Sequence, residues 1–468
     1  MPQIQVANIN QGGIADSDYM GAENSVAEAI NLDIHSEAGI IKCNQALTLD
    51  HTPDAAVNDF VACSNGSTYE FQENGKIVER EANGTVTTRG TAAPAAGSVA
   101  ILSAEEQDGY IYYAMEQRLG RFAVPAAGGS ISLNSNWATF GVGDADFHPM
   151  KKLNLVLYIG DGHQVAQVDG GVFSANALDI EDPLRVSSLG NIDTDLLIGT
   201  FIASNVLRTQ VLRWNTWSVS FSVSDPIPEV GVNAFLDSDN IVLVNCGTKG
   251  NMYIYDGAQL SLYKKVKGDY TGTNKAKVVN NAVYNFNGMP LFGLSQISGE
   301  GVNLGVYSIA RTNRNYPYVL NLEYTISTGN LANIIIDAIV PISADQFLVA
   351  WQDENDGTSY GVDILSLTVK ATGHFITRTF LLDRSVGTEF GFAHVPYRSL
   401  PDDTDIKIYP NVDYAGFATE KTSTNDDSRK KKYTEAGIGD AHALQTKVQL
   451  VPNANDAPEV EMLLIDTP

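Results

Sequence analysis

Short apolar runs that end in a glycine-rich turn recur along the chain, and each is followed by a second short run. The clearest copy is Ile241–Gly257, in which Ile-Val-Leu-Val-Asn-Cys precedes Gly-Thr-Lys-Gly and then Asn-Met-Tyr-Ile-Tyr. Leu155–Gly170 follows the same pattern. β-Branched and aromatic residues favour a pleated, half-buried strand, and glycine permits the tight reversal. Each copy therefore predicts a two-stranded hairpin whose apolar face needs a neighbour to cover it.

The spacing of these hairpins predicts the architecture. Their first strands begin near Phe60, Tyr110, Leu155, Leu196, Ile241, Ala282 and Phe347. Most of the steps are about 40 to 50 residues, which is the length of a four-stranded propeller blade, and the longer last step indicates an insertion. We therefore expect an all-β chain that forms a β-propeller of about seven blades. An array of β-sandwiches and a β-solenoid are the alternative folds.

Both ends of the chain depart from this repeat. Residues 1–58 are polar and rich in turns, and we interpret them as an arm for assembly that packs on the propeller or on a neighbouring subunit. The propeller is expected to span 59–372. In 373–468 the apolar runs are longer and alternate with polar residues, which indicates a β-sandwich-like domain with one solvated face. Asn24–Asn31 and Ile101–Gln107 are the segments with a helical pattern.

The charge balance argues against a nucleic-acid-binding surface. The chain has 468 residues with 30 basic and 55 acidic side chains, a net charge of -25. Affinity for phosphate depends on clustered Lys and Arg, whereas an acidic wall would repel DNA and let it slide past without specific binding. Such acidity is also found in proteins from saline habitats.

Cysteine usage and hydropathy bear on the environment of the chain. Cys43, Cys63 and Cys246 show no paired spacing, and the last two lie in apolar, strand-like runs, so we expect buried free thiols and no disulfide framework. The first residues have neither a basic start nor an apolar core, so no signal peptide is predicted. Since no apolar run approaches the ~18 residues of a membrane span, we expect a protein made in a cytoplasm and not inserted in a membrane.

The sequence offers little support for catalysis. It has no repeated Ser-x-Asp-x-Gly-x-Thr-Trp turn of the sialidase type, no nucleophile elbow and no phosphate-binding loop. Asp144, Asp146 and His148 lie close together, but their spacing matches no metal site, so we interpret them as a polar loop. We expect no enzyme activity, no catalytic residue, no metal and no cofactor.

Aromatic and basic residues remain as candidates for binding, because Trp, Tyr and Arg dominate interface hot spots and sugar platforms. The candidates are Trp137, His148, Trp214, Trp217, Arg311, Arg314, Tyr316, Tyr318, Arg429, Lys430 and Lys431. The alternative for the Trp residues is burial between neighbouring blades. The alternative for Arg429–Lys431 is a solvated hairpin tip, and its functional interpretation is contact with an acidic neighbour.

Three stretches resemble a family of virion proteins of tailed bacteriophages. They are Gly12–Ser17 with Leu32–Gly39, Trp137–Phe140 with Phe147–Met150, and Arg213–Phe221 with Ile227–Ala234. The resemblance extends over most of the chain and implies a structural part of the particle. By architecture the chain also resembles the propeller-bearing nozzle or tail-hub proteins of short-tailed phages, which combine a propeller with β-sandwich extensions.

The resemblance leads to a functional hypothesis. We expect a structural component of the tail or neck, a nozzle or hub that forms part of the DNA-ejection conduit, located in the virion and assembled in the host cytoplasm. The expected partners are copies of itself in a cyclic ring, portal, adaptor or tail proteins, and passing genomic DNA that is not specifically bound. The alternatives are a tail-tip protein that binds a receptor or a host surface glycan, and a propeller glycoside hydrolase.

Overall fold

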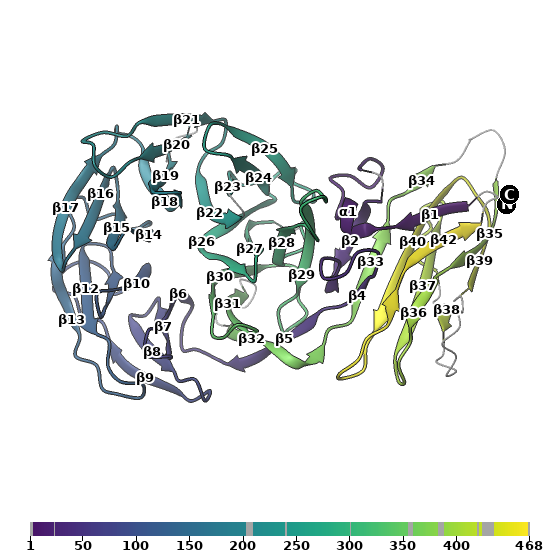
Figure 1. The fold of residues 1–468 in the computed structure, drawn as a ribbon, viewed down its shortest axis with the longest axis horizontal. Helices are drawn as coiled ribbons and strands as arrows, with labels where there is room; N and C mark the ends of the chain where they lie inside the picture. The colour runs from purple at the N-terminus through teal and green to yellow at the C-terminus, as the bar shows by residue number, and fades with distance from the viewer. Residues whose placement is uncertain are drawn as a thin grey trace. The chain divides into compact units, whose positions relative to one another are not determined.

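The chain divides into two compact units in the computed structural model, which describes residues 3–22, 24–202, 209–238, 241–299, 301–353, 359–381, 388–418, 421–423 and 435–466 (Figure 1). Unit 1 comprises Met1–Thr48, Gly305–Gly329 and Leu365–Pro468, and unit 2 comprises Leu49–Leu304 and Asn330–Ile364. Strands dominate both units. Among the described residues the single helix is the short α1 (Ile9–Gly12). The prediction of an all-β chain is confirmed.

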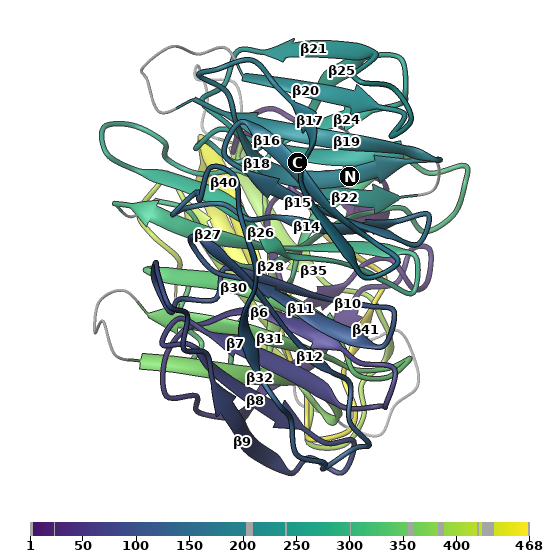
Figure 2. The ribbon, with the colours of Figure 1, turned by 90° about the vertical axis from the view of Figure 1, so that its left-hand side faces the viewer.

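Unit 2 is a series of four-stranded antiparallel sheets of the kind that form propeller blades (Figures 1 and 2). The first two sheets are β6 (Val57–Ala62), β7 (Thr68–Gln72), β8 (Lys76–Arg80) and β9 (Val86–Thr91), then β10 (Ser103–Gln107), β11 (Tyr110–Ala114), β12 (Arg118–Ala123) and β13 (Asn134–Thr139). The next two are β14 (Met150–Leu153), β15 (Val156–Asp161), β16 (Gln164–Asp169) and β17 (Val172–Asp179), then β18 (Arg185–Ile192), β19 (Asp195–Phe201), β20 (Thr209–Trp214) and β21 (Val223–Ile227). In every sheet the strands are hydrogen-bonded in chain order.

The series continues to the end of unit 2. The sheet of β22 (Val232–Ser238), β23 (Ile241–Cys246), β24 (Asn251–Tyr255) and β25 (Leu260–Lys265) is followed by the hairpin of β26 (Lys275–Phe286) and β27 (Met289–Ser298). The final sheet is β30 (Ile334–Pro341), β31 (Phe347–Asp353), β32 (Ser359–Lys370) and β5 (Gln45–His51). Its fourth strand therefore comes from the beginning of the chain. In Figure 1 the first strand of each sheet lies toward a common centre and the fourth strand lies outside.

Apolar side chains fill the space between successive sheets. Tyr69 and Phe71 of β7 pack with Tyr113 of β11 and Phe122 of β12, and the rings of Tyr69 and Phe122 lie 5.5 Å apart. Similar clusters join each later pair of sheets up to β22–β25. A further cluster joins the final sheet to the first, with Phe60 of β6 against β30 and β31. Each sheet thus covers its neighbour, as the repeat pattern required.

The strand order defines two faces of unit 2. Since neighbouring strands are antiparallel, the turns that join first to second and third to fourth strands share one face, here called face A. Asn154–Leu155 and Asn215–Ser222 are two such turns. The turns from second to third strands and the connections between sheets lie on the opposite face, face B. The segments 140–149 and 247–250 belong to face B.

The hairpins expected from the sequence are present, mostly as the second and third strands of a sheet. Ile241–Cys246 and Asn251–Tyr255 pair as β23 and β24, with Cys246 opposite Asn251. Phe60 and Ala282, by contrast, lie in the innermost strands β6 and β26. The inner and outer strands were missed at most sheets, because their apolar runs are shorter and less regular.

Unit 1 interleaves three distant segments of the chain. One sheet has the order β1 (Gln3–Ala7), β42 (Met462–Asp466), β35 (Thr388–His394), β39 (Glu435–Ala441). A second contains β28 (Gly305–Ala310), β29 (Val319–Tyr324), β2 (Val26–Ile30), β33 (Gly373–Thr377), β40 (Ala443–Val451), β37 (Asp405–Val412) and β38 (Lys421–Ser423), with β34 (Phe380–Leu381) beside β40. Two short pairs are β3 (Leu32–Asp33) with β4 (Lys42–Cys43), and β36 (Tyr397–Ser399) with β41 (Glu459–Val460).

Three expectations, about the N-terminal segment, the domain boundaries and the helical segments, need correction. The N-terminal segment is not a separate arm, because β1 pairs with β42 from Gln3↔Asp466 to Ala7↔Met462. The division at 58 and 372 also differs from the two units, since Gly305–Gly329 groups with unit 1. The helical patterns of Asn24–Asn31 and Ile101–Gln107 were misleading, because pairing with neighbouring strands places Val26–Ile30 and Ser103–Gln107 in sheets.

Candidate binding site at the inner strands of unit 2

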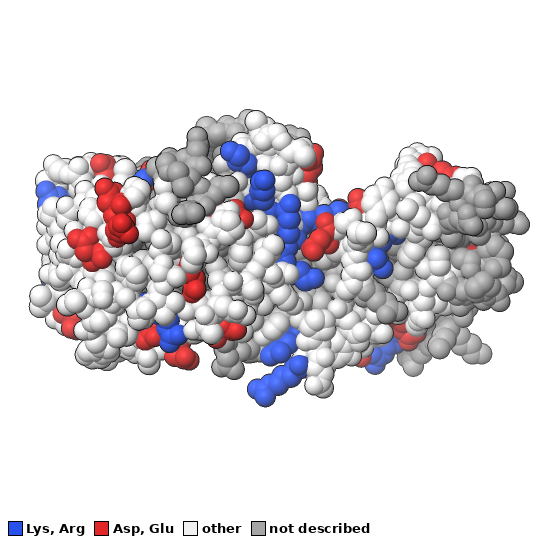
Figure 3. Space-filling model, turned by 90° about the horizontal axis from the view of Figure 1, so that it is seen from above, with Lys and Arg blue, Asp and Glu red and all other residues white. Residues whose placement is uncertain are grey.

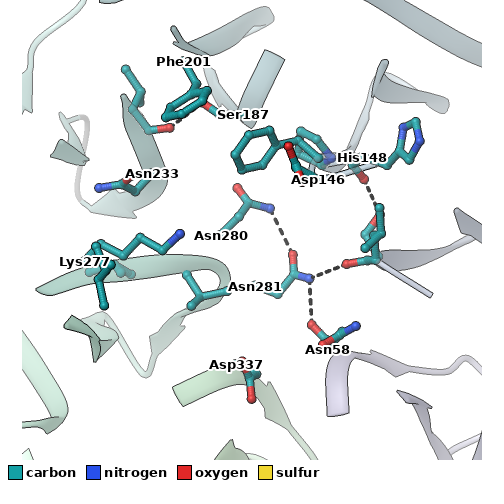
Figure 4. A pocket seen from close by; sticks show the side chains of 18 of the residues that line it. Asn58, Asp146, His148, Ser187, Phe201, Asn233, Lys277, Asn280, Asn281 and Asp337 are labelled. Carbon is teal, nitrogen blue, oxygen red and sulfur yellow. Dashed lines mark hydrogen bonds between the residues drawn. The ribbon is translucent and has the colours of Figure 1, made fainter. Parts of the chain in front are cut away.

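A pocket of about 410 Å³ lies among the inner strands of unit 2 (Figure 4). Its polar lining residues are Asn58, Ser103, Asp146, His148, Ser187, Asn233, Thr248, Lys277, Asn280, Asn281 and Asp337. Most of these residues stand at the beginning of a first strand or in a connection before it. The pocket therefore opens at the face B end of the channel around which the sheets are arranged.

Asparagine side chains form the wall of the pocket. The Asn281 Nδ2 donates to the backbone oxygens of Asn58 at 2.9 Å and Leu102 at 3.4 Å, which links β26 to the first two sheets (Figure 4). The Nδ2 of Asn280 donates to Asn281 Oδ1 at 3.0 Å. On the other side, Asn233 Nδ2 donates to Asn245 Oδ1 at 2.7 Å. Asn281 thus ties β26 to two other sheets, whereas the bonds of Asn280 and Asn233 lie within one strand and one sheet.

Lys277 of β26 and Asp337 of β30 face this pocket from neighbouring sheets. Burial lowers the pKa of Lys277, and the charges of Asp146 and Asp337 oppose that effect. Burial raises the pKa of Asp337 to about 7, although two contacts from Gln352 Nε2, at 3.2 and 3.1 Å, favour the carboxylate. Within the described ranges no ion pair or hydrogen bond reaches the side-chain Nζ of Lys277. The ammonium group therefore stands partly buried in the pocket without a direct partner.

Hydrogen bonds and a ring contact with other residues of the chain fix the segment with Asp144, Asp146 and His148. Arg185 bridges both carboxylates, with Nε at 2.7 Å from Asp144 Oδ2 and Nη1 at 3.0 Å from Asp146 Oδ2. The His148 ring stacks on Phe140 with centroids 4.1 Å apart, and its nitrogens lie 2.7 Å and 3.0 Å from the backbone oxygens of Gly160 and Glu116. His148 is buried and positions the connection before β14. No cluster suited to a metal ion occurs among the described residues.

The three candidate tryptophans have different surroundings. Trp214 is 2% exposed, and its ring packs on Tyr158 at a centroid distance of 5.6 Å. Trp137 is half-buried, and the Arg121 guanidinium lies between it and Tyr110 at 4.3 and 4.4 Å from the ring centres. Trp217 is 89% exposed. Burial between blades thus describes Trp214, whereas Trp217 is available to a partner.

The remaining candidates lie in unit 1 or outside the described residues. The Arg311 guanidinium lies 4.6 Å from the centre of the Tyr318 ring. Arg314 is exposed, and Tyr316 is half-buried. Arg429, Lys430 and Lys431 lie outside the described residues. Lys277, Asp337 and the two adjacent asparagines of β26 were missed, although a lysine and an aspartate inside apolar strand runs are a usable signal.

Unit 1 contains a buried Ser–His–Glu cluster that invites a test for nucleophilic catalysis. His35 Nε2 lies 3.2 Å from Ser308 Oγ and also 3.2 Å from Glu323 Oε1. Ser308 Oγ donates to Glu323 Oε1 at 2.6 Å, and Asn44 Nδ2 donates to Glu323 Oε2 at 2.6 Å. A catalytic triad needs the acid on the far nitrogen of the imidazole. Here the acid and the serine share one nitrogen, so the cluster serves as a buried hydrogen-bond network.

Comparisons with known proteins found distant likenesses among solved structures alone. No protein-family model and no curated protein matches the chain. Among solved structures, the chain is similar to the WD40 β-propeller domain of Doa1, with 11% identity, 69% of this chain and 97% of that chain covered, and a TM-score of 0.44. It is similar to the RRP9 WD40 repeats, with 9% identity, 69% and 99% covered, and a TM-score of 0.46.

A third similar structure is an exo-β-1,3-galactanase from Phanerochaete chrysosporium, with 5% identity, 78% of this chain and 95% of that chain covered, and a TM-score of 0.31. Likenesses this distant say nothing about function. No described helix has the length and apolar character that crossing a membrane requires.

Proposed function

We propose that the chain is a structural subunit of a tailed-phage tail or neck that assembles with copies of itself and with neighbouring virion proteins. The blade-like sheets of unit 2 would form a seven-bladed propeller, in which β26 and β27 begin the sixth blade and β5 completes the seventh. Support for the virion role comes from the three sequence stretches that resemble phage virion proteins. The structural observation that carries the assembly role is the turn that presents Trp217.

The Trp217 turn is held by hydrogen bonds on its own residues. Asn215 Oδ1 accepts from the backbone N–H of Trp217 at 3.0 Å and of Ser218 at 2.9 Å. The indole N–H of the buried Trp214 donates to Ser218 O at 2.8 Å. Trp217 and Val219 are nonetheless 89% and 96% exposed. A fixed turn that exposes a large aromatic side chain suits an interface anchor, because little entropy is lost on binding.

Other exposed apolar residues lie on the same face. Leu155 is 75% exposed at the β14–β15 turn, and Val172 is 71% exposed at the β16–β17 turn. Leu155 also has a φ of 66°, a left-handed conformation that is costly for a branched side chain. Both turns belong to the sheet that precedes the one carrying Trp217. Face A of two adjacent sheets therefore offers an apolar surface for another protein.

The proposed conduit requires several copies of the chain. The pocket at the inner strands has a volume of about 410 Å³, which is the size of a small-molecule site and far too small for a DNA duplex. A DNA passage would therefore have to be the lumen of a ring of subunits. A net charge of -25 would make the wall of such a lumen repel phosphate and prevent specific binding.

A non-enzymatic role is supported by how the acidic groups of the pocket are used. Asp146 is paired with Arg185, and Asp337 faces the amide of Gln352. Glycoside hydrolysis needs two carboxyl groups on either side of a bound sugar, one of them ionised and free to act. The alternative of a tail-tip protein that binds a glycan is favoured by a different observation, the unpaired ammonium of Lys277.

Two measurements test the proposal. Immunogold electron microscopy of intact and tail-stripped particles of the phage that encodes the chain should place label at the head–tail junction or the tail shaft. Label at the distal tip would favour the receptor-binding alternative, and unlabelled particles would refute a virion role.

Light scattering of the purified chain tests the assembly surface separately. The wild-type protein should form a closed oligomer, and Trp217→Ala should shift it toward the monomer. Leu262→Ala is the matched control, because Leu262 is 58% exposed on β25 of the following sheet and not on the Trp217 turn, and its truncation should leave the oligomer intact. A monomeric wild-type protein, or equal effects of the two variants, would refute the assembly role of this turn.

A further inference from the structure

We propose that the pocket at the face B end of the channel binds an anionic polyol of monosaccharide size, with its negative group on Lys277 and its hydroxyl groups on asparagine oxygens. The inference concerns unit 2 alone and does not depend on the virion role. A volume of about 410 Å³ falls within the roughly 300–1,000 Å³ of typical small-molecule sites.

Lys277 supplies the anion-binding group. Its side chain projects into the pocket from β26 (Figure 4), and among the described residues no carboxylate lies within ion-pair distance of it. A partly buried ammonium that lacks a partner gains most from a ligand that brings its own negative charge. The two carboxylates whose charges act on Lys277 already have other partners: Asp146 pairs with Arg185, and Asp337 accepts from Gln352.

The asparagines supply acceptors for hydroxyl groups. The Nδ2 groups of Asn58, Asn233 and Asn280 donate to protein oxygens, Ile101 O at 2.8 Å, Asn245 Oδ1 at 2.7 Å and Asn281 Oδ1 at 3.0 Å. Within the described part of the chain no hydrogen bond reaches the Oδ1 atom of these three residues. Their side-chain oxygens are therefore ready to accept, and a polyol provides the hydroxyl donors that they lack.

Aromatic rings complete the wall. Phe147 and Phe201 both line the pocket, and their ring centres lie 5.4 Å apart. Phenyl rings pack against the apolar C–H face of a sugar ring, which inorganic anions do not have. This combination of one cation, several acceptors and an apolar wall points to a sugar acid or a sugar phosphate, and not to a simple ion.

Other lysines lie on the same face of unit 2 as the pocket. Lys249 lies in the β23–β24 turn, Lys264 and Lys265 end β25, and Lys275 begins β26, so all four belong to face B. In the view of Figure 3, Lys and Arg side chains gather in a band across the middle of the visible face. In a chain with a net charge of -25, a local excess of lysine attracts anions to the pocket.

Calorimetric titration of the purified full-length chain tests the inference with glucuronate, glucose 6-phosphate, glucose, acetate and inorganic phosphate. At least one anionic sugar should bind about tenfold or more tightly than glucose, because it adds a charged hydrogen bond. Preference for glucuronate or for glucose 6-phosphate identifies the anionic group as carboxylate or phosphate. Equal binding of glucose, or equal binding of the simple anions, would overturn the assignment, and so would the absence of binding by both anionic sugars.

Variants separate the pocket from the surface lysines. Lys277→Gln should weaken binding of the preferred sugar by about tenfold or more, whereas Lys275→Gln, on the same face and exposed, should change it less than about twofold. Lys277→Arg keeps the charge and should retain measurable binding, which guards against a folding defect in the glutamine variant. Equal effects of Lys277→Gln and Lys275→Gln would refute a specific role for Lys277.

Discussion

The Arg80 guanidinium makes two hydrogen bonds of 2.8 Å each to the carboxylate of Asp50. Asp50 lies on β5, the outer strand of the final sheet, and Arg80 lies on β8 of the first sheet. The pair thus joins the two sheets that are furthest apart in the series along the chain. Next to it, His51 Nδ1 lies 3.0 Å from Asp50 Oδ2, and His51 Nε2 lies 2.8 Å from Glu70 Oε1.

Replacing Asp50 should destabilise unit 2 strongly. The side chains of Asp50 and Arg80 are only 13% and 8% exposed, so Asp50→Ala would leave a buried guanidinium without its partner. Breaking a buried pair in this way costs about 3 to 5 kcal/mol. The midpoint of urea denaturation should fall accordingly. As a control, Lys76→Ala removes the exposed pair with Asp54 and should cost less than about 1 kcal/mol; equal losses would show that the closing pair contributes little.

The same cluster predicts loss of stability in alkali. Burial disfavours the charged form of His51, but the carboxylates of Asp50 and Glu70, which accept from its ring and carry negative charge, outweigh burial and raise the pKa from 6.5 to about 9. A histidine whose pKa is raised by folding stabilises the fold fully at pH values below its pKa in the unfolded chain. This stabilisation is lost as the pH rises through its pKa in the folded chain. The free energy of unfolding should therefore fall by roughly 2 to 3 kcal/mol between pH 6.5 and 9.5.

His51→Gln provides the comparison for this pH dependence, because glutamine cannot gain the charge. Its free energy of unfolding should change less over the same range, and the two curves should converge near pH 9.5. Parallel curves for wild type and variant would assign the alkaline loss to other groups.

Truncation of Trp214 should lower the free energy of unfolding far more than truncation of Trp217, three positions away. Trp214 is buried in the cluster between two sheets, so Trp214→Ala should lower the free energy of unfolding by about 3 to 5 kcal/mol. Trp217 is exposed, so Trp217→Ala should change it by less than about 0.5 kcal/mol. Thermal unfolding of both variants measures the difference. A large loss for Trp217→Ala would mean that its indole supports the turn and is not reserved for a partner.

The sequence predicts what local patterns determine. Alternation and glycine turns located the hairpins, including β23 and β24, because strand pairing within a hairpin depends on adjacent residues. The apolar runs around Cys63 and Cys246 correctly indicated buried thiols. Helical patterns failed at Val26–Ile30, where pairing with β33 decides the conformation.

The candidate pocket depends on contacts that no local pattern records. Lys277 and Asp337 stand on the first strands of different sheets, and they meet only because these strands converge on the channel. Likewise, the partner of Asp50 is fixed by the return of β5 to the final sheet. The exposure of Trp217 follows from the Asn215 turn, which the Arg-Trp-Asn-Thr-Trp motif alone did not distinguish from a buried position.

Asp337 should destabilise the fold at alkaline pH, and its neutral analogue should remove that effect. Burial raises its pKa from 3.8 to about 7, so the folded chain favours the protonated carboxyl. For an aspartate whose pKa is raised by folding, the free energy of unfolding is highest at pH values below its pKa in the unfolded chain. It falls as the pH rises toward its pKa in the folded chain. Asp337→Asn keeps an oxygen for Gln352 Nε2 and should stabilise the chain at pH 8 by about 2 to 4 kcal/mol, with little effect at pH 4. Urea denaturation at both pH values measures the change in the free energy of unfolding. Asp237→Asn is the control and should have little effect at either pH, because Asp237 is half-exposed and its ion pair with Lys151 is long. A variant less stable than wild type at pH 8 would show that the Asp337 carboxylate is needed in its charged form, as a direct partner of Lys277.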